Sequence, residues 1–365
     1  MSRLKASATQ YQDTTPPTSF AEQPLTPPPT DEKQFAHAHR VISLFREIRA
    51  GRHIERGPWT EFWLVKGEYD EIQRLLQKDE DLWGYVKDKI RHDYNAEKDF
   101  LVVRMPTSVH ELFVDGVEDA IRSQLKVVRS GSGPEARFAQ KVRPARSTEI
   151  KLPAEEGLPS RKSKYEPDAS FWHDDAKYPG VIIEIAYSQK RKRLYRLAES
   201  YLLDSDASVQ VVVGLDIEYG KKGSREATLS VWRAQVIGNE LRVVDEVADE
   251  TFRGDQGNNT DHPGLQLHLS DFAHEELVQE ELGDQNREIN VSGQQLCQFL
   301  AAAENKVQQD RSLSKHLVAP GIRKRKRPDT PPEEIASSDE AQYMEQERKV
   351  ARRMEAQDPN YEDSF

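Results

Sequence analysis

Cysteine is almost absent from this chain, and Cys297 is the single one among 365 residues. An intramolecular disulfide is therefore impossible, and a zinc site built from cysteines is not expected. Long apolar runs are also missing, and none approaches the ~20 residues that a membrane span requires. No apolar stretch follows residues 1–5, so a secretory signal is not expected either. These absences indicate a protein of a reducing compartment with no membrane partner.

Apolar residues and net positive charge are scarce as well. Hydrophobic residues make up 36% of the chain and the formal net charge is -11, with a mean hydropathy of -0.80. So polar a chain is expected to be partly unfolded, and its charge argues against indiscriminate nucleic-acid binding. We predict disordered tails over residues 1–34, rich in Thr and Pro, and over residues 305–365, rich in charge. One globular domain is expected over residues 35–304, with its core at about 99–236.

Helical spacing dominates the first part of this domain. Apolar residues fall on one helix face near its start, at Val41, Ile42, Leu44, Phe45 and Ile48. A second apolar stripe predicts one helix over residues 69–94. The chain therefore begins with an N-terminal helical portion.

Strands and helices alternate in the core. Apolar, β-branched runs predict strands at residues 99–106, 148–152, 181–185, 208–215 and 227–236. One helix is expected to begin at Ser108 as its cap, with Glu111 at the matching capping-box position. The clearest helix carries Leu194, Leu197, Ala198, Tyr201 and Leu202 on one face. The order predicts an α/β fold in which helices flank a mixed central sheet.

Two carboxylates stand out against these strands. Asp168 follows Pro167 at the start of one strand, and Glu184 interrupts the apolar run of residues 181–185. A carboxylate in such a run is costly to bury unless something pairs with it. Two carboxylates on neighbouring strands can hold a hard divalent cation such as Mg²⁺.

This arrangement resembles the PD-(D/E)XK nuclease superfamily, which has the restriction-endonuclease-like fold. The resemblance implies that Asp168 and Glu184 bind Mg²⁺ or Mn²⁺ in a nuclease acting on DNA or RNA. The first core helix often lends such a site an acid, for which Glu111 and Glu118 are candidates. For Glu111, a role in capping the helix is an equal alternative.

The family's lysine, two residues after the second acid, is replaced here by Ala186. Some branches of the family carry this lysine in the next helix, so the resemblance assigns its role to Lys190 or Lys192. Gln189 can position water beside them. The substitution at Ala186 favours the alternative, a fold that no longer cuts and binds nucleic acid or protein instead.

Basic residues gather around these acids. Arg143, Arg146 and Lys164 belong to a basic stretch, while Arg191 and Arg193 begin the helix after Glu184. Cations at a helix N-terminus oppose the macrodipole, which an anion or acidic site nearby would relieve. We interpret these residues as contacts to the phosphates of a nucleic acid. The alternative is an ordinary solvated surface.

A dense basic run lies in the C-terminal tail, comprising Arg323, Lys324, Arg325, Lys326 and Arg327. The run resembles a nuclear-localisation sequence, which predicts an import receptor as partner and a nuclear location, with the cytoplasm otherwise. A nonspecific polyelectrolyte contact with RNA or DNA is the alternative.

Three functional hypotheses follow. The first is a metal-dependent nuclease, in which the metal activates water and offsets charge on the scissile phosphate. The second is a catalytically inactive nuclease-like module that binds nucleic acid or protein in the nucleus. The third treats Asp168 as a turn residue and Glu184 as the partner of a basic residue in the following helix.

Overall fold

The computed structural model describes residues 35–52, 59–153, 162–186, 191–217 and 223–312, with a few isolated positions beyond them. The chain divides into two units, residues 1–312 and residues 313–365. The basic run at residues 323–327 and the predicted N-terminal tail lie outside the described residues. Among those residues, no helix has the length and apolar character needed to cross a membrane.

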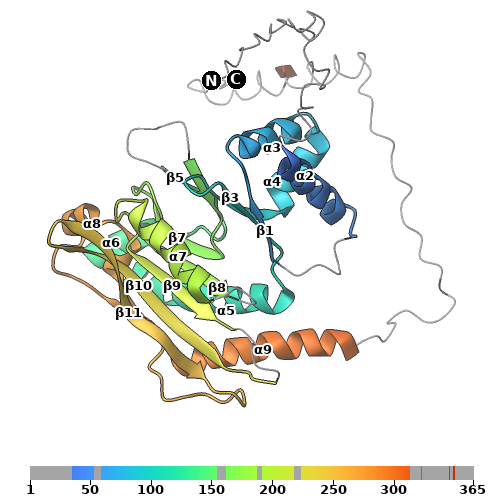
Figure 1. The fold of residues 1–365 in the computed structure, drawn as a ribbon. Helices are drawn as coiled ribbons and strands as arrows, with labels where there is room; N and C mark the ends of the chain where they lie inside the picture. The colour runs from blue at the N-terminus through green and yellow to red at the C-terminus, as the bar shows by residue number, and fades with distance from the viewer. Residues whose placement is uncertain are drawn as a thin grey trace, which may run out of the picture. The chain divides into compact units, whose positions relative to one another are not determined.

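Three short helices form the N-terminal portion (Figure 1): α2 (Ala36–Arg49), α3 (Glu68–Gln77) and α4 (Glu80–Lys89). The prediction of one helix over residues 69–94 is wrong, because α3 and α4 are separate and the chain continues into a strand. Asp79 causes the break, since its side chain accepts a hydrogen bond from the Leu82 N–H (3.2 Å) and caps α4. Apolar residues of all three helices form one buried cluster with the adjoining strands.

An antiparallel five-stranded sheet accompanies these helices, and sequence reasoning missed most of it. Its order is β1-β3-β2-β6-β5. The strands are β1 (Trp59–Trp63), β2 (Arg91–Asn95), β3 (Phe100–Arg104), β5 (Ile150–Pro153) and β6 (Lys162–Tyr165). The N-terminal portion is therefore not purely helical, because strands β1, β2 and β3 pack with its helices.

The second sheet is mixed and six-stranded, in the order β11-β10-β9-β8-β7-β4. Its strands are β4 (Val142–Pro144), β7 (Ala169–His173), β8 (Val181–Ala186), β9 (Val211–Asp216), β10 (Ala227–Ile237) and β11 (Glu240–Arg253). Strands β8 and β9 are parallel, and the other neighbours are antiparallel. Because parallel neighbours need a crossover, α7 (Arg191–Leu203) connects them.

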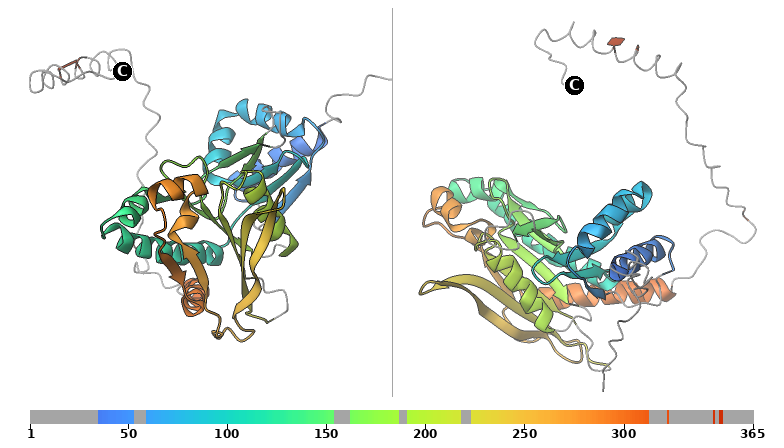
Figure 2. Two further views of the ribbon diagram at one scale, coloured as in Figure 1. Left: turned by 90° about the vertical axis from the view of Figure 1, so that its left-hand side faces the viewer. Right: turned by 45° about the horizontal axis from the view of Figure 1, so that its top comes forward.

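Helices cover both faces of this sheet (Figures 1 and 2). On one face α5 (Ser108–Arg129) and α9 (Gly293–Ser312) pack against Ile183 and Ile185. On the other face α7 packs against Ile182. Side chains alternate along a strand, so Glu184 points toward α7. The chain is thus α/β with a mixed sheet flanked by helices, as predicted, and α9 continues to Ser312, beyond residue 305 where the C-terminal tail was expected to begin.

The remaining elements complete the α5 face. They are α6 (Pro134–Lys141), β12 (Leu265–His268), the short 3-10 helix η2 (Leu269–Phe272), α8 (Glu275–Glu281) and β13 (Glu288–Val291). Strands β12 and β13 pair as a small antiparallel sheet. The buried Arg253 side chain donates to Glu304 at 2.6 Å, which ties β11 to α9.

Candidate functional site

Asp168 and Glu184 converge on a single nitrogen atom. Asp168 directly precedes β7 and Glu184 lies in β8, and these strands are neighbours. Arg104 Nη1 lies 3.5 Å from Asp168 Oδ1 and 3.1 Å from Glu184 Oε2. All three residues are buried, with exposed fractions of 4%, 1% and 5% for Asp168, Glu184 and Arg104. The adjacent strands therefore bring the two acids together around a buried guanidinium.

Asp168 is surrounded by donors. Its Oδ2 accepts a hydrogen bond from the Ile185 N–H at 2.8 Å and lies 3.0 Å from His110 Nε2. Arg91 Nη1 lies 3.5 Å from Oδ1. Burial alone would raise the pKa of Asp168, but His110, Arg104 and the Ile185 amide outweigh it and lower that pKa. Asp168 is therefore held as a carboxylate.

Glu184 has the opposite tendency. Burial raises its pKa well above the ordinary value, and the negative charge of Asp168 raises it further. The Tyr201 hydroxyl on α7 donates to Glu184 Oε1 at 2.7 Å. The hypothesis that Glu184 pairs with a cation of the following helix is therefore wrong for the described side chains, since α7 supplies a tyrosine and β3 supplies the cation.

Arg104 is held from the other side as well. Its Nη2 donates to Asp93 Oδ1 at 3.1 Å and also to the Glu166 carbonyl oxygen, while Nε lies 3.0 Å from Asp93 Oδ2. Burial disfavours its charge, but Asp93, Glu184 and Asp168 outweigh that cost and raise the pKa of Arg104. We call Arg104, Asp93, Asp168 and Glu184 the arginine cluster.

A divalent cation does not fit between Asp168 and Glu184 as they are arranged. Each of their four oxygens already faces a protein donor, from Arg91, Arg104, His110, Ile185 or Tyr201. Arg104 itself lies at the point where the two acids meet. A cation could reach this pair only after Arg104 had moved, because no carboxylate oxygen of the pair is free.

A cleft of about 740 Å³ opens beside the arginine cluster, lined among others by Arg91, Arg104, Glu111, Glu149 and Glu166. Glu111 does not act in the predicted capping box. Thr107, rather than Ser108, caps α5 by accepting from the His110 N–H at 3.3 Å. Glu111 instead lies 3.1 Å from Arg91 Nη1 and 3.4 Å from His110 Nδ1, at the rim of the cleft.

The other predicted acid and phosphate contacts lie in ion pairs. Glu118 is buried in α5, with its Oε1 3.8 Å from both Arg122 and Arg146. Arg143 makes two hydrogen bonds to Asp174, each of 3.0 Å.

Lys164 and Arg193 are paired too. Lys164 Nζ lies 2.8 Å from Glu166 and 3.2 Å from Glu149, and Arg193 donates to Glu61 at 2.7 Å. Most of the predicted basic rim is therefore neutralised locally, and Lys164 alone among these cations adjoins acids of the cleft.

The candidates for the missing lysine cannot be placed at the cluster. Gln189 and Lys190 lie outside the described residues. Arg191 and Lys192 begin α7, and their side chains lie outside the described part of the structure. Ala186 ends β8 and is buried.

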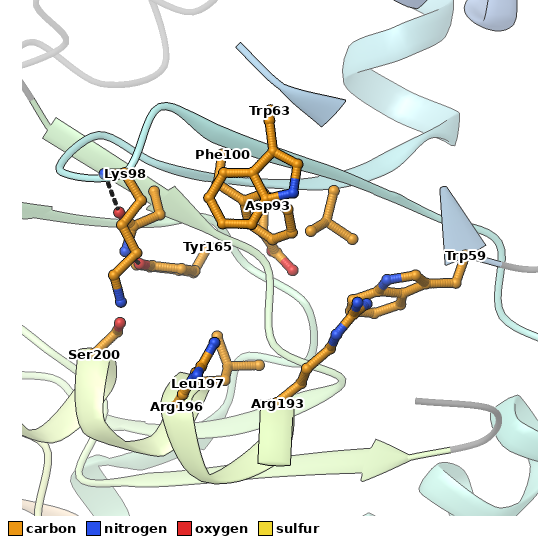
Figure 3. A pocket seen from close by; sticks show the side chains of 12 residues that line it. Trp59, Trp63, Asp93, Lys98, Phe100, Tyr165, Arg193, Arg196, Leu197 and Ser200 are labelled. Atoms are coloured by element: carbon orange, nitrogen blue, oxygen red, sulfur yellow. Dashed lines mark hydrogen bonds between the residues drawn. The ribbon is translucent and has the colours of Figure 1, made fainter. Parts of the chain in front are cut away.

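A second cavity, which we call the aromatic pocket, is lined by Asp93 of the arginine cluster and is separate from the cleft (Figure 3). It holds about 150 Å³. Its lining includes Trp59, Trp63, Phe100, Tyr165, Lys98, Arg193, Arg196 and Asp93. In Figure 3 the rings of Trp63 and Phe100 face Arg196 and Leu197 across the cavity. Nothing in the sequence marked it, because its residues come from β1, β2, β3, β6, α7 and the turn between β2 and β3.

A third group lies near α8. His173, Asp175 and Glu281 place ligand atoms within 4.8 Å of one another and could hold a metal ion. His173 is fully buried, and its Nε2 has no hydrogen-bond partner among the described residues. Lys141 Nζ contacts Asp175 at 2.8 Å and Glu281 at 2.7 Å. These four residues are called the lysine cluster below.

Sequence reasoning missed the cations that hold the acid pair. Arg104 ends an apolar strand, Phe100-Leu101-Val102-Val103, much as Glu184 interrupts another. A buried charge of each sign in an apolar strand is the signal that could have joined them. His110 carried no such signal.

Comparisons with known proteins do not assign the chain to a family. No family model matches the chain, and no curated protein matches its sequence.

Proposed function

We propose that this chain is a nuclease-like protein of the PD-(D/E)XK type that binds nucleic acid without cutting it, with Arg104 where the superfamily holds its cation. The convergence of Asp168 and Glu184 on Arg104 Nη1 carries the proposal. Ala186 at the usual lysine position agrees with it.

The order of elements supports the same assignment. Helix α5 is followed by β4, β7 and β8, which are antiparallel neighbours, and then by α7 and the parallel strand β9. Helices α5 and α9 lie on one face of these strands and α7 on the other, and the two acids lie directly before β7 and within β8. This order supports the proposal of the restriction-endonuclease-like core that the acid motif implies.

Nucleic acid is the proposed partner because cations reach the cleft beside the cluster. Lys87, Lys89, Arg91 and Arg104 line it. Acids line it too, so affinity is expected to be moderate and to fall steeply with salt.

Fluorescence anisotropy with labelled DNA and RNA, in EDTA and in Mn²⁺, tests the proposal. We expect salt-sensitive binding in both buffers and no shortening of the strands. Arg91→Gln is expected to weaken binding, while Arg242→Gln, on the distant strand β11, is not. Salt-independent binding, or none, would contradict the proposal.

Metal-dependent hydrolysis is the second candidate, favoured by the close approach of Asp168 and Glu184. It requires Arg104 to leave the acid pair. Calorimetric titration of Mn²⁺ into the wild type and into Glu184→Gln separates the two functions. Binding lost in the variant, together with cleavage lost in Asp168→Asn, would establish hydrolysis by Mg²⁺ or Mn²⁺ chemistry.

Nuclear import through residues 323–327 accompanies either function as a proposal. The compact basic run in the sequence supports it. A fluorescent fusion with these five residues replaced by alanine is expected to lose nuclear accumulation; unchanged nuclear accumulation would refute the import role.

A further inference from the structure

Trp63 occupies an unusual position in the aromatic pocket. It is 62% exposed, although large aromatic side chains are normally mostly buried. Its ring packs on Phe100 with centroids 4.5 Å apart and an interplanar angle of 44°. One face of the indole is thereby fixed by the protein while much of the side chain remains accessible. An ordered, exposed ring of this kind is a platform on which a planar ligand can stack.

The charges of the pocket select the kind of planar ligand. Lys98, Arg193 and Arg196 line it, and among the described lining residues Asp93 is the one carboxylate. Asp93 is already bound to Arg104, and Arg193 to Glu61. A cationic ligand such as a methylated lysine, which aromatic cages hold, would meet two further cations here. A planar group attached to an anion fits better.

The pocket also adjoins the proposed nucleic-acid cleft. Asp93 lines the aromatic pocket and Arg104 lines the cleft. Their side chains are hydrogen-bonded at 3.1 Å. The two cavities therefore share this ion pair as a wall. The volume of about 150 Å³ is smaller than a typical drug-sized site and suits one ring system.

We propose that the aromatic pocket holds an unpaired base of a single-stranded nucleic acid, stacked on Trp63, with Lys98 and Arg196 at the adjoining phosphates. This inference rests on the proposed function and names its substrate class. A base in a duplex is already stacked on both faces and cannot use the platform, so single strands bind better than duplexes.

Binding of a labelled oligothymidylate of roughly 12 nucleotides, compared with a duplex of equal length, tests this. Trp63→Ala is expected to weaken single-strand binding on the order of tenfold and to leave duplex binding unchanged. Trp63→Phe retains most of the affinity. Val65→Ala is the matched control, because Val65 is 50% exposed, lies two residues away and does not line the pocket.

Two further readouts separate stacking from a general loss of structure. The oligonucleotide quenches tryptophan emission in the wild type, and Trp63→Phe reduces that quenching to the part due to Trp59, which also lines the pocket, while binding persists. Arg196→Gln makes the negative slope of log affinity against log salt less steep, by about 0.7 for single strands.

The outcomes distinguish the two proposals. If Trp63→Ala binds single strands like the wild type while Arg91→Gln weakens binding, the aromatic pocket is not the base site and the proposed function stands. A wild type that binds duplex better than single strands would likewise show that the aromatic pocket is not the base site, and the proposed function would stand. If the wild type binds no nucleic acid, both proposals fail.

Discussion

The arginine cluster and the lysine cluster solve one electrostatic problem in two environments. Each places a cation between carboxylates from separate elements. The Arg104 side chain is 6% exposed and its partners Asp93, Asp168 and Glu184 are at most 8% exposed. The Lys141 side chain is 40% exposed, and that of Asp175 53%. Burial, rather than the number of ion pairs, separates them.

The difference teaches which of the two clusters the fold depends on. Water can solvate Lys141 and Asp175 when a partner leaves, so an exposed pair of this kind contributes little. The carboxylates around Arg104 have no such alternative, because removing one partner of a buried pair strands the other charge. We expect mutations to separate the clusters in the following order.

Arg104→Met has the largest expected effect. It leaves Asp93, Asp168 and Glu184 buried without their shared cation, which typically costs roughly 3–5 kcal/mol in the free energy of unfolding. Urea denaturation followed by far-UV circular dichroism measures this. Lys141→Met is the matched control and is expected to shift the midpoint far less. Equal effects of the two substitutions would remove the distinction between the clusters.

The second-largest expected effect is the change in the free energy of unfolding with pH that the titration of His110 causes. Burial disfavours the charged imidazole of His110, but Asp168 and Glu111 outweigh it and raise the pKa of His110 from 6.5 to about 9. A raised folded-state pKa stabilises the protein below the unfolded value, and this contribution is lost as pH rises from 6.5 through 9. The loss is at most about 3 kcal/mol.

Urea midpoints taken across that range check the prediction. His110→Gln is expected to flatten the profile, because the side chain no longer titrates. Asp168 acts in the opposite sense, since its lowered pKa gives stability that disappears as pH falls below the ordinary aspartate value. A His110→Gln profile as steep as that of the wild type would assign the alkaline loss to another group.

Tyr201→Phe has a smaller effect. It removes the hydrogen bond to Glu184 Oε1 and leaves that buried oxygen without its donor, at a cost of roughly 1–3 kcal/mol. Tyr178→Phe is the control, because the Tyr178 hydroxyl makes only a long 3.4 Å contact with the Lys151 carbonyl. Thermal unfolding compares the two variants, and a larger loss in Tyr178→Phe would argue against a strong Tyr201–Glu184 bond.

The smallest expected change concerns metal binding at the lysine cluster. Lys141→Gln removes the cation that contacts Asp175 and Glu281, so calorimetry should show Zn²⁺ binding strengthened by roughly a few-fold. Adding His173→Gln to that variant is expected to abolish the gain. If Zn²⁺ binds the double variant as tightly as the single one, His173 is not a ligand.

The sequence predicted the features that are local along the chain. The apolar run that Glu184 interrupts and the apolar helix stripe ending at Leu202 follow from residues close in sequence. These were enough to place Asp168 beside Glu184 on neighbouring strands.

Partners that come from distant elements escaped prediction. Arg104 lies 64 positions from Asp168 and 80 from Glu184, in a different sheet, and no periodicity encodes that pairing. The one-residue difference in the cap of α5 was missed for a related reason. Thr107 and Ser108 are equivalent caps in sequence, and only the direction of the entering chain selects Thr107.

Arg104 has a consequence for how the protein unfolds. Its backbone belongs to the five-stranded sheet, whereas Glu184 belongs to the six-stranded sheet and Asp168 precedes β7 of that sheet. Parting the sheets would leave Asp168 and Glu184 without their cation, and Arg104 would retain Asp93 of β2 but lose these two carboxylates. The two sheets are therefore expected to open as one cooperative unit. Amide protons of β3 and β8 should exchange with solvent at the same free energy, and Arg104→Met should let β3 exchange first.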